Sequence, residues 1–202
     1  DDFRDNKKSQ IIIREIIVNR DKSEFITDEN TDNYEIFNAR YTSSKAELTK
    51  LFNTQYNFEL SKSFGKIAGE IQFRKLYDNN RQFNLRLFAG TFLFKKTTST
   101  YFDFGLDRPT DYLFESEYIG RSETTGIFSQ QSIGTEGFFK SKLETRFANQ
   151  WMITSNISAS IWNWVEVYGD IGMMKNKYSS AKFVYDNGIR LNLVPDYFEL
   201  YF

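Results

Sequence analysis

The chain contains no cysteine and no histidine among its 202 residues. Without cysteine it has no disulfide framework, no thiol nucleophile and no thiolate metal site. Without histidine it lacks the commonest general base, the imidazole metal ligands, the HExxH zinc signature and any Ser-His triad. We therefore expect no catalytic residue and no cofactor within this chain.

Proline, net charge and long apolar runs are also scarce. There are 2 prolines, where average usage of about 5% would give roughly 10. The formal net charge of −1 gives no electrostatic argument for binding nucleic acid. The longest early apolar run, 11–18, is broken by Arg14 and Glu15, so no transmembrane helix is predicted. The chain begins at Asp1 without an initiator methionine or a signal peptide, so we expect a processed product or a fragment.

Aromatic residues are abundant and follow a period of two. Phe 21, Tyr 12 and Trp 3 make up 18% of the chain, and such a composition with so little proline favours long strands. In 52–60, every second residue from Phe52 to Leu60 lies on one face, opposite Asn, Gln, Asn and Glu. The same alternation recurs in 66–74, 82–93, 151–161, 165–173, 183–193 and 198–202. The pattern predicts an all-β, antiparallel protein.

Alternation alone does not say which face is inside: the apolar face is the core of a soluble sandwich but meets lipid in a membrane barrel. Segments of nine or more residues match the roughly 9–11 needed to cross a bilayer at a tilt. Short turns at 77–81, 162–164 and 194–196 fall at one end, and the long connection 96–150 falls at the other. This asymmetry is typical of outer-membrane proteins. We predict an up-and-down transmembrane β-barrel of the outer-membrane type, incomplete in this chain.

The predicted barrel divides the chain into two segments, one lipid-facing set of residues and one set at the membrane interface. Residues 1–33 form a polar connector with a candidate first strand at 10–19, and residues 34–202 form the barrel with 96–150 as its long external connection. The residues predicted to face lipid are Phe58, Ile71, Leu87, Ile157, Val167 and Ile189. Aromatic residues near strand ends form the predicted interfacial girdle: Tyr77, Trp151, Trp162 and Trp164.

The polar face carries charges of both signs that would line the lumen: Glu59, Glu70, Arg74, Arg86, Glu166, Asp170, Asp186 and Arg190. Such a face could conduct a solute or anchor a plug. We favour pairing of acids with bases across the wall, because an unpaired buried charge is costly. No run of one sign is present to select an ion.

The long connection is rich in acids. Asp103, Asp107, Asp111, Glu115 and Glu117 lie within 101–118, and loop carboxylates can hold Ca²⁺. No EF-hand spacing is present and acidic surface loops are ordinary. Asp103, Asp107 and Asp111 are therefore weak metal candidates, and no metal site is predicted.

Several stretches together resemble a known family. They are 102–114 (FDFGLDRPTDYLF), 120–131 (GRSETTGIFSQQ), 147–152 (FANQWM), 184–193 (VYDNGIRLNL) and 195–202 (PDYFELYF). They resemble the C-terminal outer-membrane β-barrel region of large proteins of gliding-type Gram-negative bacteria. Those proteins carry an N-terminal zinc aminopeptidase-like domain of the gluzincin (HExxH) class. The resemblance covers 102–202, about half of the chain.

The resemblance implies that any peptidase residues belong to a part outside this chain, because a sequence without histidine can carry none of them. It also implies that further strands follow Phe202. In contrast, the alternation of Phe198, Leu200 and Phe202 is typical of the terminal strand of an outer-membrane protein, and the sequence leaves both alternatives open.

Three functions follow from these expectations. The first is an anchor in the bacterial outer membrane, in contact with membrane lipid, that holds a surface domain or joins other subunits of an outer-membrane complex. The second is a pore for small solutes. The third is a soluble β-sandwich that acts as a binding module.

Overall fold

The computed structural model describes residues 6–19, 33–78, 81–107, 110–115, 134–194 and 198–202. Parts of the predicted connector and of the connection 96–150 lie outside these residues, as do Glu117, the stretch 120–131 and residues 195–196 of the predicted turn at 194–196. The strands are β1 (Lys7–Asn19), β2 (Asn33–Ala46), β3 (Lys50–Ser61), β4 (Phe64–Asp78), β5 (Arg81–Lys95), β6 (Phe104–Gly105), β7 (Phe147–Ala148), β8 (Trp151–Trp162), β9 (Val165–Lys175), β10 (Lys182–Val194) and β11 (Phe198–Tyr201).

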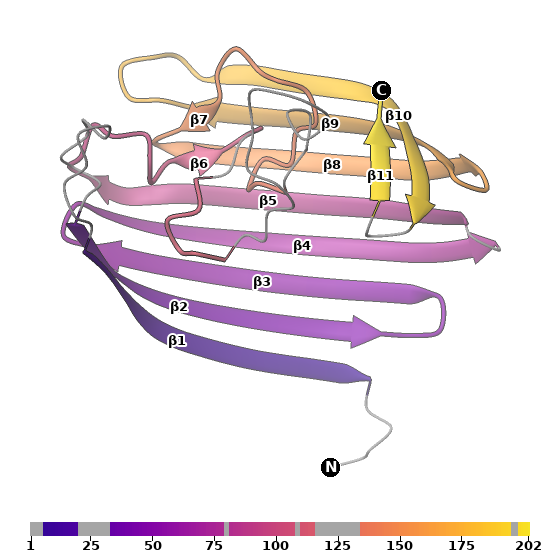
Figure 1. Cartoon of the computed structure of the whole chain (residues 1–202), viewed down its shortest axis with the longest axis horizontal. Coiled ribbons are helices and arrows are strands. Elements are labelled where there is room, and N and C mark those ends of the chain that lie inside the picture. The colour runs from indigo at the N-terminus through magenta and orange to yellow at the C-terminus, as the bar shows by residue number, and fades with distance from the viewer. Residues whose placement is uncertain (1–5, 20–32, 79–80, 108–109, 116–133, 195–197) are drawn as a thin grey trace.

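Nine of these strands form one sheet in the order β1-β2-β3-β4-β5-β8-β9-β10-β11 (Figure 1). Every neighbouring pair is antiparallel. The predicted all-β, antiparallel, up-and-down architecture is therefore confirmed. The outermost strands β1 and β11 are not paired with each other, so the described sheet is open.

No helix long and apolar enough to cross a membrane occurs in the described ranges.

The strands are long because their sequences hold period-two alternation without proline. β1 to β5 run from 12 to 15 residues, and β8, β9 and β10 from 11 to 13. The strand expected at 10–19 is the last part of β1, which pairs with β2 along its whole length. Within the segment 1–33 that was interpreted as a connector, residues 7–19 thus form the first strand of the sheet.

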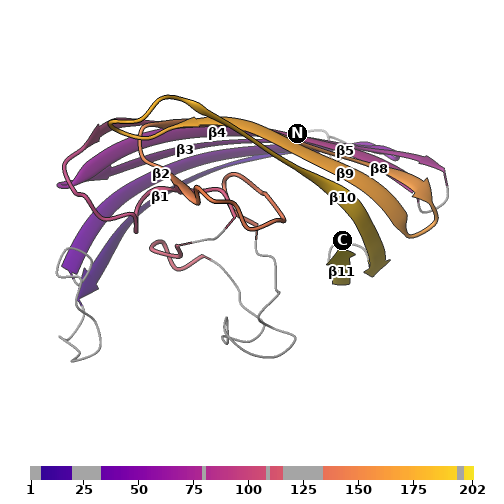
Figure 2. The same cartoon turned by 90° about the horizontal axis from the view of Figure 1, so that it is seen from above.

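The sheet is strongly curved, and the described residues of the connection between β5 and β8 lie on its concave side (Figure 2). Within that connection, β6 and β7 pair as a small second sheet. The sequence predicts an external loop over 96–150, but the described residues of this connection fold back over the polar face of the sheet. The backbone N–H of Phe139 donates to the carbonyl of Leu106 (3.0 Å), which holds the two halves of the connection together.

Two apolar clusters pack between the connection and the concave face. In the first, Phe104, Leu106 and Phe139 of the connection meet Phe88, Met152 and Met174 of the sheet. In the second, Phe102 and Tyr112 of the connection meet Tyr34, Ile36 and Phe64. Burial of these side chains, at about 25 cal/mol per Å² of apolar surface, is what holds the connection against the sheet.

Candidate functional site

The two faces of the sheet reverse the usual distribution of polar and apolar residues. On the concave face, Glu59 is 2% exposed and Asp170 is completely buried. On the convex face, Leu87 is 43% exposed and Ile157 is 42% exposed. A sheet whose carboxylates are inside and whose aliphatic side chains are outside is opposite to the arrangement of water-soluble β-proteins.

The residues predicted to face lipid share the convex face. Five of them are large apolar residues with exposed side chains, and Phe58 is half-buried. The five are Ile71, Leu87, Ile157, Val167 and Ile189. The same face carries further exposed apolar residues from almost every strand of the sheet, including Tyr56 of β3, Ile171 of β9 and Tyr185 of β10.

The predicted lumen residues lie on the concave face, and all eight have a polar partner. The first group is centred on Glu166 of β9, which is 2% exposed. It forms an ion pair with Arg190 of β10. It also accepts hydrogen bonds from Gln82 Nε2 (2.9 Å) and Ser158 Oγ (3.1 Å). Further along the sheet, Arg74 Nε donates to Asn84 Oδ1 (3.0 Å).

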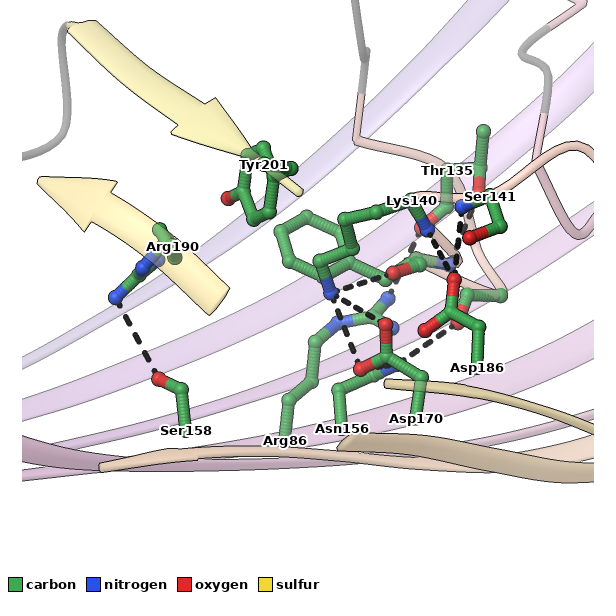
Figure 3. A network of polar contacts seen from close by, with 12 residues as sticks. Arg86, Thr135, Lys140, Ser141, Asn156, Ser158, Asp170, Asp186, Arg190 and Tyr201 are labelled. Carbon is green, nitrogen blue, oxygen red and sulfur yellow. Dashed lines mark hydrogen bonds and ion pairs between the residues drawn. The ribbon is translucent and has the colours of Figure 1, made fainter. Parts of the chain in front are cut away.

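A second group connects the sheet to the connection (Figure 3). Lys140 of the connection reaches Asp170 of β9, with Nζ 2.8 Å from Oδ2. Asn156 Nδ2 donates to Asp170 Oδ1 (2.9 Å), and Arg86 NH1 donates to Asn156 Oδ1 (3.0 Å). Arg86 forms an ion pair with Glu70 and donates to the carbonyl of Glu136 (2.9 Å). Burial lowers the pKa of Lys140, although the Asp170 carboxylate opposes this shift.

Asp186 of β10 completes this attachment. Its Oδ2 accepts the backbone N–H groups of Lys140 (3.0 Å) and Ser141 (2.8 Å). Asp170 and Asp186 are directly opposite each other in the β9–β10 pairing. One short segment of the connection therefore binds two neighbouring strands through one side chain and two backbone amides.

A third group surrounds Glu59 of β3. Tyr112 of the connection donates its hydroxyl to Glu59 Oε2 (2.8 Å), and Asn57 Nδ2 donates to Oε1 (2.6 Å). Lys66 Nζ lies 3.7 Å from Glu59 and 4.7 Å from the ring centroid of Phe104. Burial raises the pKa of Tyr112 well above its usual value, and the nearby Glu59 carboxylate adds to the shift.

Glu115 joins the connection to the first two strands. It forms ion pairs with Arg14 of β1 and with Arg40 of β2, the latter at 2.7 Å. Burial by itself would raise the pKa of Glu115, but the two guanidinium groups hold it below its usual value.

The three weak metal candidates, Asp103, Asp107 and Asp111, each have a different polar partner. Asp103 is buried and forms an ion pair with Lys95, and burial raises its pKa although the Lys95 ammonium opposes this. Asp107 Oδ2 accepts the N–H of Leu143 (2.7 Å), and Asp111 Oδ1 accepts the N–H of Glu115 (2.7 Å). No group of acidic residues suited to a metal ion occurs in the described part of the chain. The expectation of no cofactor stays a prediction.

The predicted girdle residues divide between the two ends of the sheet. Tyr77 at the end of β4 and Trp162 at the end of β8 lie at the end with the short turns, and both are exposed. Trp164, in the β8–β9 turn, is also exposed and has a φ of 114°. Trp151 opens β8 at the opposite end and is half-buried.

A polar cavity of about 240 Å³ remains between the concave face and the connection. Its lining includes Arg40, Glu59, Lys66, Glu70 and Glu136. Charged groups of both signs line it together with the apolar side chains of Phe88, Phe104 and Leu113, and the polar groups make it suited to hold water.

The residues of the connection that contact the sheet, above all Lys140 and Tyr112, were not predicted from the sequence. The sequence does contain one sign of these contacts. The polar face of the sheet is interrupted by four apolar residues that are buried in the structure: Phe64, Phe88, Met152 and Met174. Apolar residues on a face that is otherwise polar predict a covering element.

No protein-family model matches this chain, and no significant match was found among curated proteins or among solved structures.

Proposed function

We propose that this chain forms part of the wall of an outer-membrane β-barrel, together with the internal plug of that barrel, and serves as a membrane anchor. The observation that carries the proposal is the reversal of the two faces. Exposed aliphatic side chains on the convex face suit contact with hydrocarbon, and buried charges on the concave face suit a lumen. Strands of 11 to 15 residues in the main part of the sheet are long enough to cross a bilayer at a tilt.

A soluble sandwich is less well supported, because it needs a second sheet packed on the apolar face. In the described residues, the only second sheet is β6–β7, and it belongs to the connection on the polar side.

An anchor is favoured over an open pore by the connection. Lys140, Tyr112 and Glu115 hold it against the concave face through ion pairs and hydrogen bonds, and two apolar clusters bury it there. The cavity of about 240 Å³ between the described residues of the connection and the sheet is a feature that favours solute passage. The pore is therefore the second candidate.

The anchored partner follows from the resemblance of 102–202 to barrel regions joined to gluzincin-type zinc aminopeptidase-like domains. On this proposal, the chain holds such a domain, or a subunit of a larger complex, at the surface of a Gram-negative cell. The chain itself supplies attachment and no chemistry of hydrolysis.

Spin-label accessibility tests the membrane placement. Single cysteines replace Leu87, Ile157 or, as a control in the turn after β9, Ser180, and each carries a nitroxide. The chain is reconstituted into phosphatidylcholine vesicles. We expect labels at 87 and 157 to be accessible to O₂ and shielded from a water-soluble nickel chelate, and the label at 180 to show the reverse. Equal access of the chelate to all three positions would refute the membrane placement.

A further inference from the structure

β1 pairs with β2 on one side, and its other side is a free edge with no strand beside it among the described residues. It is 13 residues long, and its pairing with β2 is continuous, without a bulge. Its segment from Ser9 to Asn19 contains no proline, and of its two charged residues Arg14 is turned inward to Asn38 and Glu115. Natural edge strands are protected from further pairing by bulges, prolines, charges or short length. β11, with four residues, is short in this way. β1 is neither short nor bulged and has no proline; its charged residues are Lys7 and Lys8 at its start and Arg14 and Glu15 in its middle.

The convex face is also more exposed at β1 than elsewhere. Ile13 is 66% exposed and Ile17 is 72% exposed, against 43% for Leu87 in the interior strand β5. The neighbours on one side of β1 are therefore missing, and the apolar surface continues to its outer edge.

The hydrogen-bonding groups at that edge can be assigned. The carbonyl of Asn6 accepts the N–H of Ala46 (3.1 Å), and the register places these two residues opposite each other. Bonded pairs in an antiparallel ladder recur at every second residue. The even-numbered residues of β1 thus bond to β2, and the odd-numbered residues, Ile13 among them, direct their N–H and C=O groups outward.

From these observations we propose that the free edge of β1 binds an antiparallel, amphipathic β-strand supplied by polypeptide other than the 202 residues of this chain. This binding rests on the proposed membrane placement, since unpaired backbone groups are not tolerated in hydrocarbon. The partner strand would present apolar side chains next to Ile11, Ile13 and Ile17.

The direction of the strands excludes a second copy as the partner. All neighbours in the nine-stranded sheet are antiparallel, so β1 and β11 run in the same direction. In a copy inserted with the same membrane orientation, both edge strands would run parallel to β1. Transmembrane barrels of bacteria use antiparallel neighbours. Antiparallel closure between β1 and β11 therefore requires an odd number of added strands.

A synthetic, fluorescent peptide with the sequence of β2, residues 33–46, serves as the probe, because this strand already pairs antiparallel with β1 at the opposite edge. Binding to the detergent-solubilised 202-residue chain is followed by fluorescence anisotropy. Hydrogen exchange of the amides of Ile11, Ile13 and Ile17 is measured with and without peptide. We expect saturable binding and slower exchange at these outward amides.

Ile13→Pro removes an outward N–H while leaving the bonds to β2 in place, and Ile13→Ala keeps the N–H as the matched control. We expect Ile13→Pro to weaken peptide binding by about tenfold or more, and Ile13→Ala to change it little. Equal binding to both variants, or unchanged exchange in the unmodified chain, would overturn the proposal. Disulfide-linked dimers formed through Ile13→Cys would also overturn it in favour of a second copy. A chain that binds the peptide but is fully water-exposed in the vesicle assay would instead refute the membrane placement alone.

Discussion

The ammonium group of Lys140, in the connection between β5 and β8, lies 2.8 Å from Oδ2 of Asp170 at the middle of β9. Both side chains are almost completely buried, with 8% and 0% exposure. The pair joins an irregular segment to the wall of the sheet at a place where neither charge can be solvated. Because removal of one charge leaves the other buried without a partner, the pair makes the connection a fixed part of the fold.

Replacing Lys140 with Met should therefore destabilise the protein by about 3–5 kcal/mol, as expected when one partner of a buried ion pair is lost. The measurement is the free energy of unfolding in detergent, followed by tryptophan fluorescence. Lys142→Met, in the same connection but exposed, is the control and should cost little. The double variant Lys140→Met/Asp170→Asn should recover part of the loss. Similar losses for Lys140→Met and Lys142→Met would show that the buried pair has no special role.

Arginine on the convex face should be costly in proportion to its depth in the bilayer. Leu87→Arg, near the middle of β5, should destabilise the protein reconstituted in lipid by about 2–4 kcal/mol. Ile161→Arg, near the end of β8, should cost about 0–1 kcal/mol because the side chain can reach the interface. Both side chains are exposed, so lost packing does not distinguish them. Equal and negligible costs would contradict the assignment of this face to lipid.

Acid should weaken the attachment made by Glu115. The folded state lowers the pKa of this carboxyl group, so its stabilising contribution is complete above the pKa of the unfolded chain. The contribution is lost as the pH falls through the folded-state pKa. We expect Glu115→Gln to lose about 1 kcal/mol at pH 7, and this difference from the unmodified protein to shrink toward pH 3. If the stability difference between Glu115→Gln and the unmodified protein did not depend on pH, the charge of Glu115 would not be the cause of the loss.

Gly188 should be required for the pairing of β10 with β11. A Cβ at this position would clash with the carbonyl oxygen of Phe202. Ile189 and Phe202 exchange two backbone hydrogen bonds of 2.9 Å there. Gly188→Ala should cost about 1–3 kcal/mol and speed hydrogen exchange at Phe202. Gly169→Ala, where a Cβ would meet nothing within 4 Å, is the control. Slow exchange at Phe202 in Gly188→Ala would show that β11 tolerates the added methyl group.

The strands could be predicted from the sequence because their periodicity is local. Alternation from Phe52 to Leu60 identifies β3 without any knowledge of its neighbours, and the same holds for β8 and β9. Residues of one face can be grouped for the same reason: Leu87 and Ile157 come from strands that pair with each other, and both are exposed on the convex face. β1 was the exception, since its start at Lys7 falls in a charged stretch without alternation.

The position of the connection could not be predicted in this way. Lys140 contacts Asp170, 30 residues away in the sequence, and Tyr112 contacts Glu59, 53 residues away. The alternation of residues within one strand carries no information about contacts between residues so far apart. The aspartates at 103, 107 and 111 look like one acidic cluster in the sequence, yet each serves a different partner once the loop is folded.

The sequence by itself determined that the chain forms long antiparallel strands with one apolar and one polar face, because a period of two is a property of neighbouring residues along each strand. Only the tertiary structure decided which way the sheet curves, what covers its polar face and which buried charges meet. Those outcomes depend on contacts between residues far apart in the chain, where packing and the cost of burying an unpaired charge select one arrangement.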